Sequence, residues 1–198
     1  MSIFYIADLH FGHKNVIDFD HRPFSDIESM DNTLIKLWNK KVNDADHVYI
    51  IGDFACRNTK GEEWYLQQLH GHKHLIVGNH DMKLLNNTDA LSCLESVDKM
   101  KHISDSGTQI CLCHFPLAEW NGYYRGHTHI YGHIHNAKNE AAHFMRTKFH
   151  ALNAGCMING YAPVTLSELI ANNHIWKMGG WEETNTDQKE LEEETKNV

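Results

Sequence analysis

The chain has 198 residues, 41% of them hydrophobic, and a formal net charge of −8. This length suits one domain with a sizeable buried core, and no apolar run approaches the length that spans a membrane. The acidic balance argues against binding duplex nucleic acid, because that affinity comes from neutralising phosphates with Lys and Arg.

The charge is unevenly distributed. Residues 182–198 contain seven acidic residues and two lysines, so residues 1–181 carry only −3. We predict one domain over residues 1–181 and a solvated, disordered acidic tail over residues 182–198.

The five cysteines are an odd number without a Cys-x-x-Cys pair, which is typical of reduced thiols. Since the apolar start is also too short for a signal peptide, we expect a cytoplasmic location.

In the first half of the chain, apolar runs predict strands over residues 2–8 and 47–52. Between them, Ser25-Asp26-Ile27-Glu28 has the spacing of a capping box, and apolar residues at helical spacing predict a helix over 26–41. A second helix is expected near residues 60–70.

The second half alternates short strands and helices in the same way. The predicted elements are a strand over 75–77, a helix near 88–94, a hairpin over 96–115 that turns at Ser104-Asp105-Ser106-Gly107, a strand ending at Tyr131, strands within 147–158 and a helix near 165–172.

Five polar blocks each follow one of these apolar runs. They are Asp8-Leu9-His10, Gly52-Asp53, Gly78-Asn79-His80-Asp81, His114 and Gly132-His133-Ile134-His135. Loops at the carboxyl ends of strands are where open α/β folds gather their ligands, so we expect these blocks to meet. Carboxylates, imidazoles and one amide oxygen suit divalent Mn, Fe, Zn or Ni. The blocks supply enough ligands for two such ions.

The spacing within the blocks supports this interpretation. Asp8 and His10 lie two apart on an extended segment and project the same way, as do His133 and His135. Asp53 can bridge two ions with its two oxygens. Two bound ions would activate water to hydroxide and clamp a phosphoryl group, which predicts phosphate-ester hydrolysis.

The order Asp-x-His, Gly-Asp, Gly-Asn-His-Asp, His, Gly-His-x-His resembles the calcineurin-like metallophosphoesterase superfamily over residues 1 to about 170. The opening Asp8-Leu9-His10-Phe11-Gly12-His13 is similar to that of a subgroup of small, cap-less bacterial and phage phosphoesterases. The resemblance implies an α/β fold, a four-layer sandwich of two mixed β-sheets flanked by helices.

The resemblance also implies roles for individual residues. One metal would be held by Asp8, His10, Asp53 and His135, and the other by Asp53, Asn79, His114 and His133. His80 would lie beside the phosphate as the catalytic general acid, or as an electrostatic stabiliser.

One departure from the family pattern matters. The protein Ser/Thr phosphatases of this superfamily continue Gly-Asp with a second Asp and then Arg-Gly, and here Cys56 takes the place of that Asp. This argues against a protein phosphatase.

Three further residues are candidates for the site, and each has two possible roles. Arg57 is a substrate contact or a surface residue, His13 contacts the phosphate or merely packs in its loop, and Asp81 orients His80 or caps the next helix.

Other matches compete with these assignments. Gly-His-x-His also occurs at 71–74 and at 126–129, but the first precedes a strand, and only the match at 132–135 follows an apolar strand end. Trp120, Tyr123 and Tyr124 follow His114 and could stack a nucleobase, although aromatic residues in a small fold more often belong to the core.

The sequence therefore favours a hydrolase acting on a small phosphorylated substrate, with a preference for phosphodiesters or nucleotides. A phosphomonoesterase or protein phosphatase is the alternative within the enzyme class, together with a nuclease acting on single strands. A non-catalytic metal-binding scaffold of the same fold and a metal-buffering protein are the alternatives outside it. The oligomeric state is not specified by any of these patterns.

Overall fold

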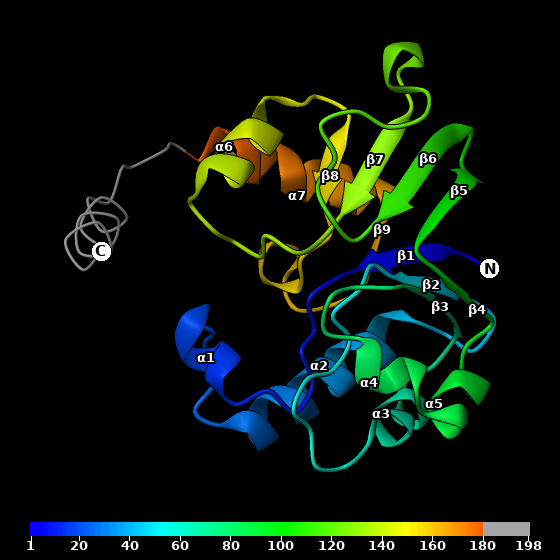
Figure 1. The fold of residues 1–198 in the computed structure, drawn as a ribbon, viewed down its shortest axis with the longest axis vertical. Coiled ribbons are helices and arrows are strands. Elements are labelled where there is room, and N and C mark those ends of the chain that lie inside the picture. The colour runs from blue at the N-terminus through cyan, green and yellow to red at the C-terminus, as the bar shows by residue number, and fades with distance from the viewer. Residues whose placement is uncertain (180–198) are drawn as a thin grey trace, which may run out of the picture.

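The computed structural model describes residues 1–179, so the predicted tail over 182–198 lies outside the described residues. Two β-sheets are stacked on each other, with α2 to α5 on the outer side of the first and α6 and α7 beside the second (Figure 1). The first sheet has the strand order β4-β3-β2-β1-β9, and the second has the order β5-β6-β7-β8.

Both sheets are mixed. In the first, β1 to β4 are parallel and β9 is antiparallel to β1, and in the second, β5 is antiparallel to β6 while β6, β7 and β8 are parallel. The strands are β1 (Ile3–Ile6), β2 (His47–Ile50), β3 (His72–Ile76), β4 (Ser96–Asp98), β5 (Met100–Asp105), β6 (Thr108–Cys113), β7 (Thr128–Tyr131), β8 (Ala151–Asn153) and β9 (Val164–Thr165).

Most of the helices lie in the connections between parallel strands, and α7 follows β9. The helices are α1 (Asn15–Phe19), α2 (Ile27–Lys41), α3 (Glu62–Gln68), α4 (Met82–Leu85), α5 (Thr88–Ser92), α6 (Glu140–Thr147) and α7 (Leu166–Met178), with 3-10 turns at Tyr123–Arg125 and Cys156–Asn159. Within the described residues, none of these helices is long and apolar enough to span a membrane.

Three hydrophobic cores separate four layers. Because successive strand residues face opposite sides of a sheet, Phe4 packs with the apolar faces of α2 and α3, while its neighbour Tyr5 faces the second sheet. The third core lies on the outer side of the second sheet, where Tyr131 of β7 packs with Met145 of α6. The predicted α/β sandwich of two mixed sheets flanked by helices is confirmed.

Several local predictions need correction. The N-cap of α2 is Asp26, whose side chain accepts the backbone N–H of Ser29, so the predicted cap at Ser25 is one residue early. Strand β3 starts at His72, before the predicted strand over 75–77, because it pairs in parallel with β2 from its first residue. The region 96–115 is not one hairpin, since β4 belongs to the first sheet and only β5 and β6 form the predicted turn.

Candidate metal centre

The five polar blocks meet at one edge of the sandwich. Strands β1, β2 and β3 of the first sheet and β6 and β7 of the second all end there, and each is followed by one block. Two groups of side chains have ligand atoms within 4.8 Å of one another, and they share Asp53. The first group is Asp8, His10, Asp53 and His135, and the second is Asp53, His114 and His133.

The distances in the first group suit a cation. His10 Nε2 and His135 Nε2 are 3.0 Å apart, and Asp53 Oδ2 is 3.7 Å from His10 Nε2. Atoms that lie about 2.1 Å from one ion are about 3.0–3.4 Å from each other, so these separations are close to those of a shared ligand sphere. Asp8 Oδ2 is also buried without a hydrogen-bond partner, as expected for an oxygen that binds a metal.

The second group is completed by the amide of Asn79. Asn79 Oδ1 is 3.1 Å from His114 Nε2 and 3.0 Å from His133 Nδ1, and His114 Nε2 is 3.5 Å from Asp53 Oδ2. The residues of both groups therefore fit the two divalent ions that the motifs imply, and Asp53 lies where a bridging carboxylate is needed.

Two histidines are fixed by hydrogen bonds outside the groups. The carbonyl of Ile51 can only accept, so His114 Nδ1 donates to it at 2.8 Å and Nε2 faces Asp53. His135 Nδ1 is 2.8 Å from Asp20 Oδ2, which leaves Nε2 directed at the first group. Carboxylates and carbonyls behind metal-binding histidines commonly fix the ring in this way.

Asp20 and Arg22 were missed in the sequence. The buried Arg22 guanidinium donates to Asp20 and also to the backbone carbonyls of Asp8 and Leu9, so it joins the Asp20–His135 pair to the first polar block. The one available signal is the density of charged residues in Asp18-Phe19-Asp20-His21-Arg22, within the loop after the first block.

Burial and neighbouring charges control the protonation of these groups. Burial, with the nearby His135, lowers the pKa of His10 to about 2, so this imidazole stays neutral and available as a ligand. Burial alone would lower the pKa of His114, but its hydrogen bond with Asp53 and the charges of Asp8 and Asp53 outweigh that effect and raise the pKa to about 9. A metal ion binding at His114 would therefore displace a proton.

The backbone at the site is strained. Five of the predicted ligands have positive φ angles, namely Asp8, His10, Asp53, His133 and His135. The left-handed region costs a residue with a side chain of order 1–3 kcal/mol, and such outliers gather at functional sites. The site is also too crowded for a side chain at residue 78, since a Cβ atom at Gly78 would lie 2.3 Å from Asp53 Oδ1.

The candidate catalytic residue His80 lies in a cavity of about 400 Å³ beside the two groups. His13, Arg57 and Cys56 line the same cavity. Cys56 Sγ is 3.6 Å from His80 Nδ1, so the residue that replaces the phosphatase Asp still contacts the histidine. Arg57 is exposed.

Asp81 has neither of its two predicted roles. Its carboxylate accepts the backbone N–H groups of Asp53, Phe54 and Gly78, and α4, which it precedes, has no side-chain cap. Because the residue is fully buried, it cannot contact a substrate. It acts behind the site by holding two polar blocks together.

The competing Gly-His-x-His segments lie elsewhere. His72 and His74 are on β3, at the end of the strand opposite Asn79. His129 is buried, donates through Nδ1 to the carbonyl of Cys111 and accepts the N–H of Leu117, so both ring nitrogens already have partners. The segment at 132–135 is the one that joins the two groups.

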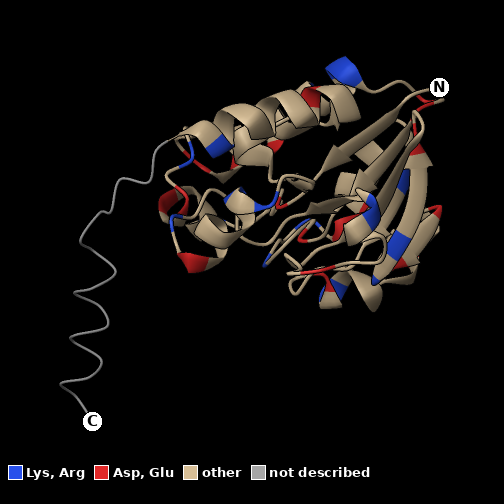
Figure 2. Ribbon diagram, turned by 90° about the horizontal axis from the view of Figure 1, so that it is seen from above, with Lys and Arg blue, Asp and Glu red and all other residues tan. Residues whose placement is uncertain are grey.

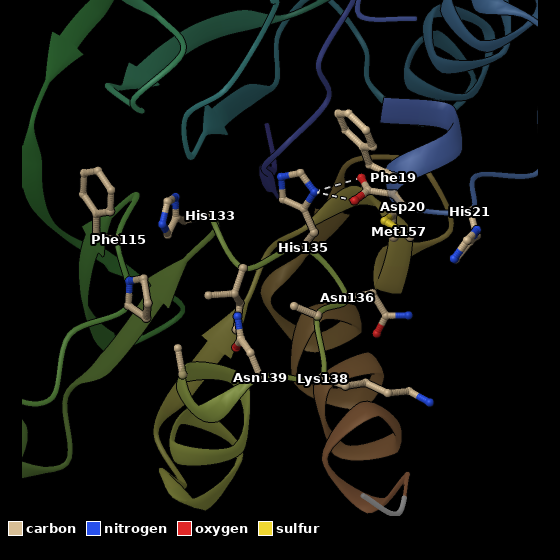
Figure 3. Close-up of a pocket in the computed structure, with 14 residues that line it drawn as sticks. Phe19, Asp20, His21, Phe115, His133, His135, Asn136, Lys138, Asn139 and Met157 are labelled. Atoms are coloured by element: carbon tan, nitrogen blue, oxygen red, sulfur yellow. Dashed lines mark hydrogen bonds and ion pairs between the residues drawn. The ribbon is translucent and has the colours of Figure 1, made fainter. Parts of the chain in front are cut away.

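A second, larger cavity of about 710 Å³ adjoins the same ligands (Figure 3). His133, His135, Phe19 and Asp20 line both cavities, so the metal ligands lie where the two meet. In the close-up, His135 lies between Asp20 on one side and His133 with Phe115 on the other.

Comparisons with known proteins place the chain in a family. No protein-family model matches the chain. The uncharacterized protein MJ1445 of Methanocaldococcus jannaschii is 32% identical over 171 residues, which cover 85% of this chain and 89% of that protein. The gene 66 protein of Mycobacterium phage L5 is 29% identical over 75% of this chain and 84% of its own length.

Among solved structures, a protein of unknown function from Aquifex aeolicus, AQ665, has the same fold. Its TM-score is 0.66 at 24% identity, with 84% of this chain and 96% of that chain covered. The chain belongs to the same family as the archaeal protein MJ1445.

Proposed function

We propose that the protein is a metal-dependent phosphoesterase that holds two divalent ions, drawn from Mn, Fe, Zn and Ni, and hydrolyses small phosphorylated substrates. The observation that carries this proposal is the pair of ligand groups that share Asp53. A carboxylate that can bridge two ions, with imidazole ligands on both sides, suits the pair of divalent metals used in two-metal phosphoryl transfer.

The side chains divide the work between binding and proton transfer. When bound, the two ions would lower the pKa of a water molecule and polarise the phosphoryl oxygens. Arg57 and His13 line the smaller cavity, where they can donate hydrogen bonds to those oxygens. His80 lies in the same cavity, where its imidazole can give a proton to the departing alcohol oxygen.

The two cavities support a preference for phosphodiesters. A phosphate placed at the ligands has space on both sides, about 710 Å³ on one and about 400 Å³ on the other. A diester has a substituent for each side, whereas a monoester would leave one of them to water.

The distribution of charge supports a small substrate over a duplex. Lys and Arg are interspersed with Asp and Glu along the described chain (Figure 2). Duplex binding needs a concentrated basic surface.

The five free cysteines support the predicted cytoplasmic location.

The test is turnover of bis-p-nitrophenyl phosphate by Mn-loaded protein, with the metal content of the same samples measured by mass spectrometry. We expect two ions per chain in the wild type, and loss of both turnover and metal in Asp53→Asn. Asp44→Asn, a change at an exposed Asp, is the matched control and should behave as wild type.

Three other outcomes would redirect the proposal. Turnover of p-nitrophenyl phosphate alone would favour a monoesterase. Two bound ions without turnover of either ester would favour the scaffold, and many weakly bound ions would favour metal buffering. Activity retained in metal-free Asp53→Asn would overturn the two-metal scheme.

A further inference from the structure

The larger cavity offers more space than a phosphate needs. It begins at the ligands His133 and His135 and continues along residues 136–139 (Figure 3). Its volume of about 710 Å³ is within the range of about 300–1,000 Å³ that is typical of ligand pockets. The space therefore accommodates a sizeable organic group attached to a phosphate at the metal centre.

One wall of this cavity presents an aromatic surface. Phe115 immediately follows the ligand His114, and its side chain is 44% exposed. The ring contacts that of His133 edge to face, with centroids 4.8 Å apart, so it is held next to the site. An exposed aromatic ring beside a catalytic centre is a suitable platform for a flat ring of the substrate.

The other aromatic residues of this loop do not offer such a platform. Trp120 is 7% exposed and its indole N–H donates to the carbonyl of His127, so it belongs to the core as expected. Tyr124 is 84% exposed, but neither Trp120 nor Tyr124 lines the cavity. Phe115 is thus the residue in this loop whose position fits stacking next to the metal ligands.

The polar part of the wall favours an anionic group. Asp20, the one carboxylate that lines the cavity, already binds Arg22 and His135. Lys138 lines the same cavity, and no described residue forms an ion pair or hydrogen bond with its ammonium group. The side chain of Asn136 accepts the indole N–H of Trp176 through Oδ1, which leaves its amide N–H groups available as donors.

We propose that this cavity is a nucleotide-binding subsite. The base of a nucleoside stacks on Phe115, and Lys138 binds a further phosphate of the same nucleotide. The preferred substrate is then a phosphodiester with a nucleotide as one of its two ester groups. The inference rests on the proposed function for the position of the scissile phosphate, and it adds the identity of the group beside it.

The first test compares two diesters with the same leaving group, thymidine 5′-(p-nitrophenyl phosphate) and methyl p-nitrophenyl phosphate. Truncating a stacking residue weakens binding by about 1–3 kcal/mol per base. Phe115→Ala should therefore raise the KM of the thymidine ester relative to that of the methyl ester about tenfold. Phe115→Trp should keep the ratio low, and Phe149→Ala, a change at an exposed Phe outside the cavity, should leave it unaltered.

The second test addresses Lys138. Adding a 3′-phosphate to the thymidine ester should lower KM in the wild type and in Lys138→Arg. In Lys138→Ala the advantage of the added phosphate should disappear, because the cation that pairs with it is gone. A 3′-phosphate without any effect on the wild-type KM would overturn the role of Lys138.

A binding measurement separates this inference from the proposed function. Thymidine 5′-monophosphate is titrated into wild-type and Phe115→Ala protein, with and without metal, and followed by calorimetry. If no ester is hydrolysed but the nucleotide binds in a Phe115-dependent way, the proposed function fails and the subsite stands. If esters are hydrolysed while Phe115→Ala changes neither the KM ratio nor nucleotide binding, the subsite is overturned.

Discussion

The two ligand groups differ in how firmly the fold holds them. In the first group, Asp8, His10 and Asp53 are at most 2% exposed, and His135 is held from behind by Asp20. In the second group, His114 is fully buried, but His133 and Asn79 are exposed. One half of the centre is thus part of the interior, and the other half reaches out to solvent.

This difference teaches that equal ligand sets need not give equal sites. A ligand that burial and hydrogen bonds already hold in place loses little conformational freedom when a cation binds, whereas an exposed side chain must be ordered at that moment. We therefore expect the first group to bind its ion more tightly and to fill first.

The largest effect should come from removing a ligand from each group in turn. His10→Ala should abolish both metal binding and turnover, by more than about 1,000-fold, because the first ion positions the shared Asp53. His133→Ala should leave one ion per chain and a measurable residual activity. Metal content and kcat are determined on the same samples, and loss of both ions in His133→Ala as well would show that the two sites are filled only together.

An intermediate effect is expected behind the first group. Asp20→Asn weakens the hydrogen bond that fixes His135, and changes at such supporting residues typically lower metal affinity by about 10–100-fold. Competition with a chromophoric chelator should show weaker binding of the first ion.

Asp18→Asn is the matched control for Asp20→Asn, since Asp18 is an exposed Asp on α1, the helix that Asp20 follows. Because Asp20→Asn also deprives Arg22 of a partner, the thermal stability of the metal-free Asp20→Asn protein is measured alongside. An equal loss of affinity for both ions in Asp20→Asn would contradict the comparison between the groups.

The smallest effect should come from Cys56, which lies beside both groups and contacts His80. A weak hydrogen bond contributes about 0.5–1.5 kcal/mol, so Cys56→Ala should slow the hydrolysis of a poor leaving group, such as an alkyl alcohol, by about two- to tenfold. Nitrophenolate departs without a proton, so nitrophenyl esters should be affected less. An equal loss for both classes of ester would mean that Cys56 acts on the fold rather than on His80.

The sequence was sufficient for the parts of the site that follow local rules. Each polar block after an apolar run lies at a strand end as predicted, because strand ends are visible in the apolar runs of the sequence. The match at 132–135, preferred over that at 126–129, is the one whose histidines lie in the two candidate ligand groups. Hydrogen bonds between distant segments have no such pattern. The Asp20–His135 pair joins residues 115 positions apart, and Asp81 holds Asp53 from 28 positions away.

Element boundaries failed for a related reason. Ser25 and Asp26 are both good N-caps, and the choice between them depends on which side chain meets the first free N–H groups of α2. Strand β3 extends back to His72 because β2 provides a partner there, and hydrophobic alternation does not record a partner.

The position of β9 has a consequence for the order in which a newly made chain can mature. Strand β1 emerges early in synthesis, yet its antiparallel neighbour is formed by residues 164–165, through the pairing of Phe4 with Thr165. Contacts between such distant segments form slowly, since a large loop must close before they are made. The His135 imidazole also joins Asp8 only after more than a hundred further residues have been added. Metal loading is therefore expected only after both sheets are complete.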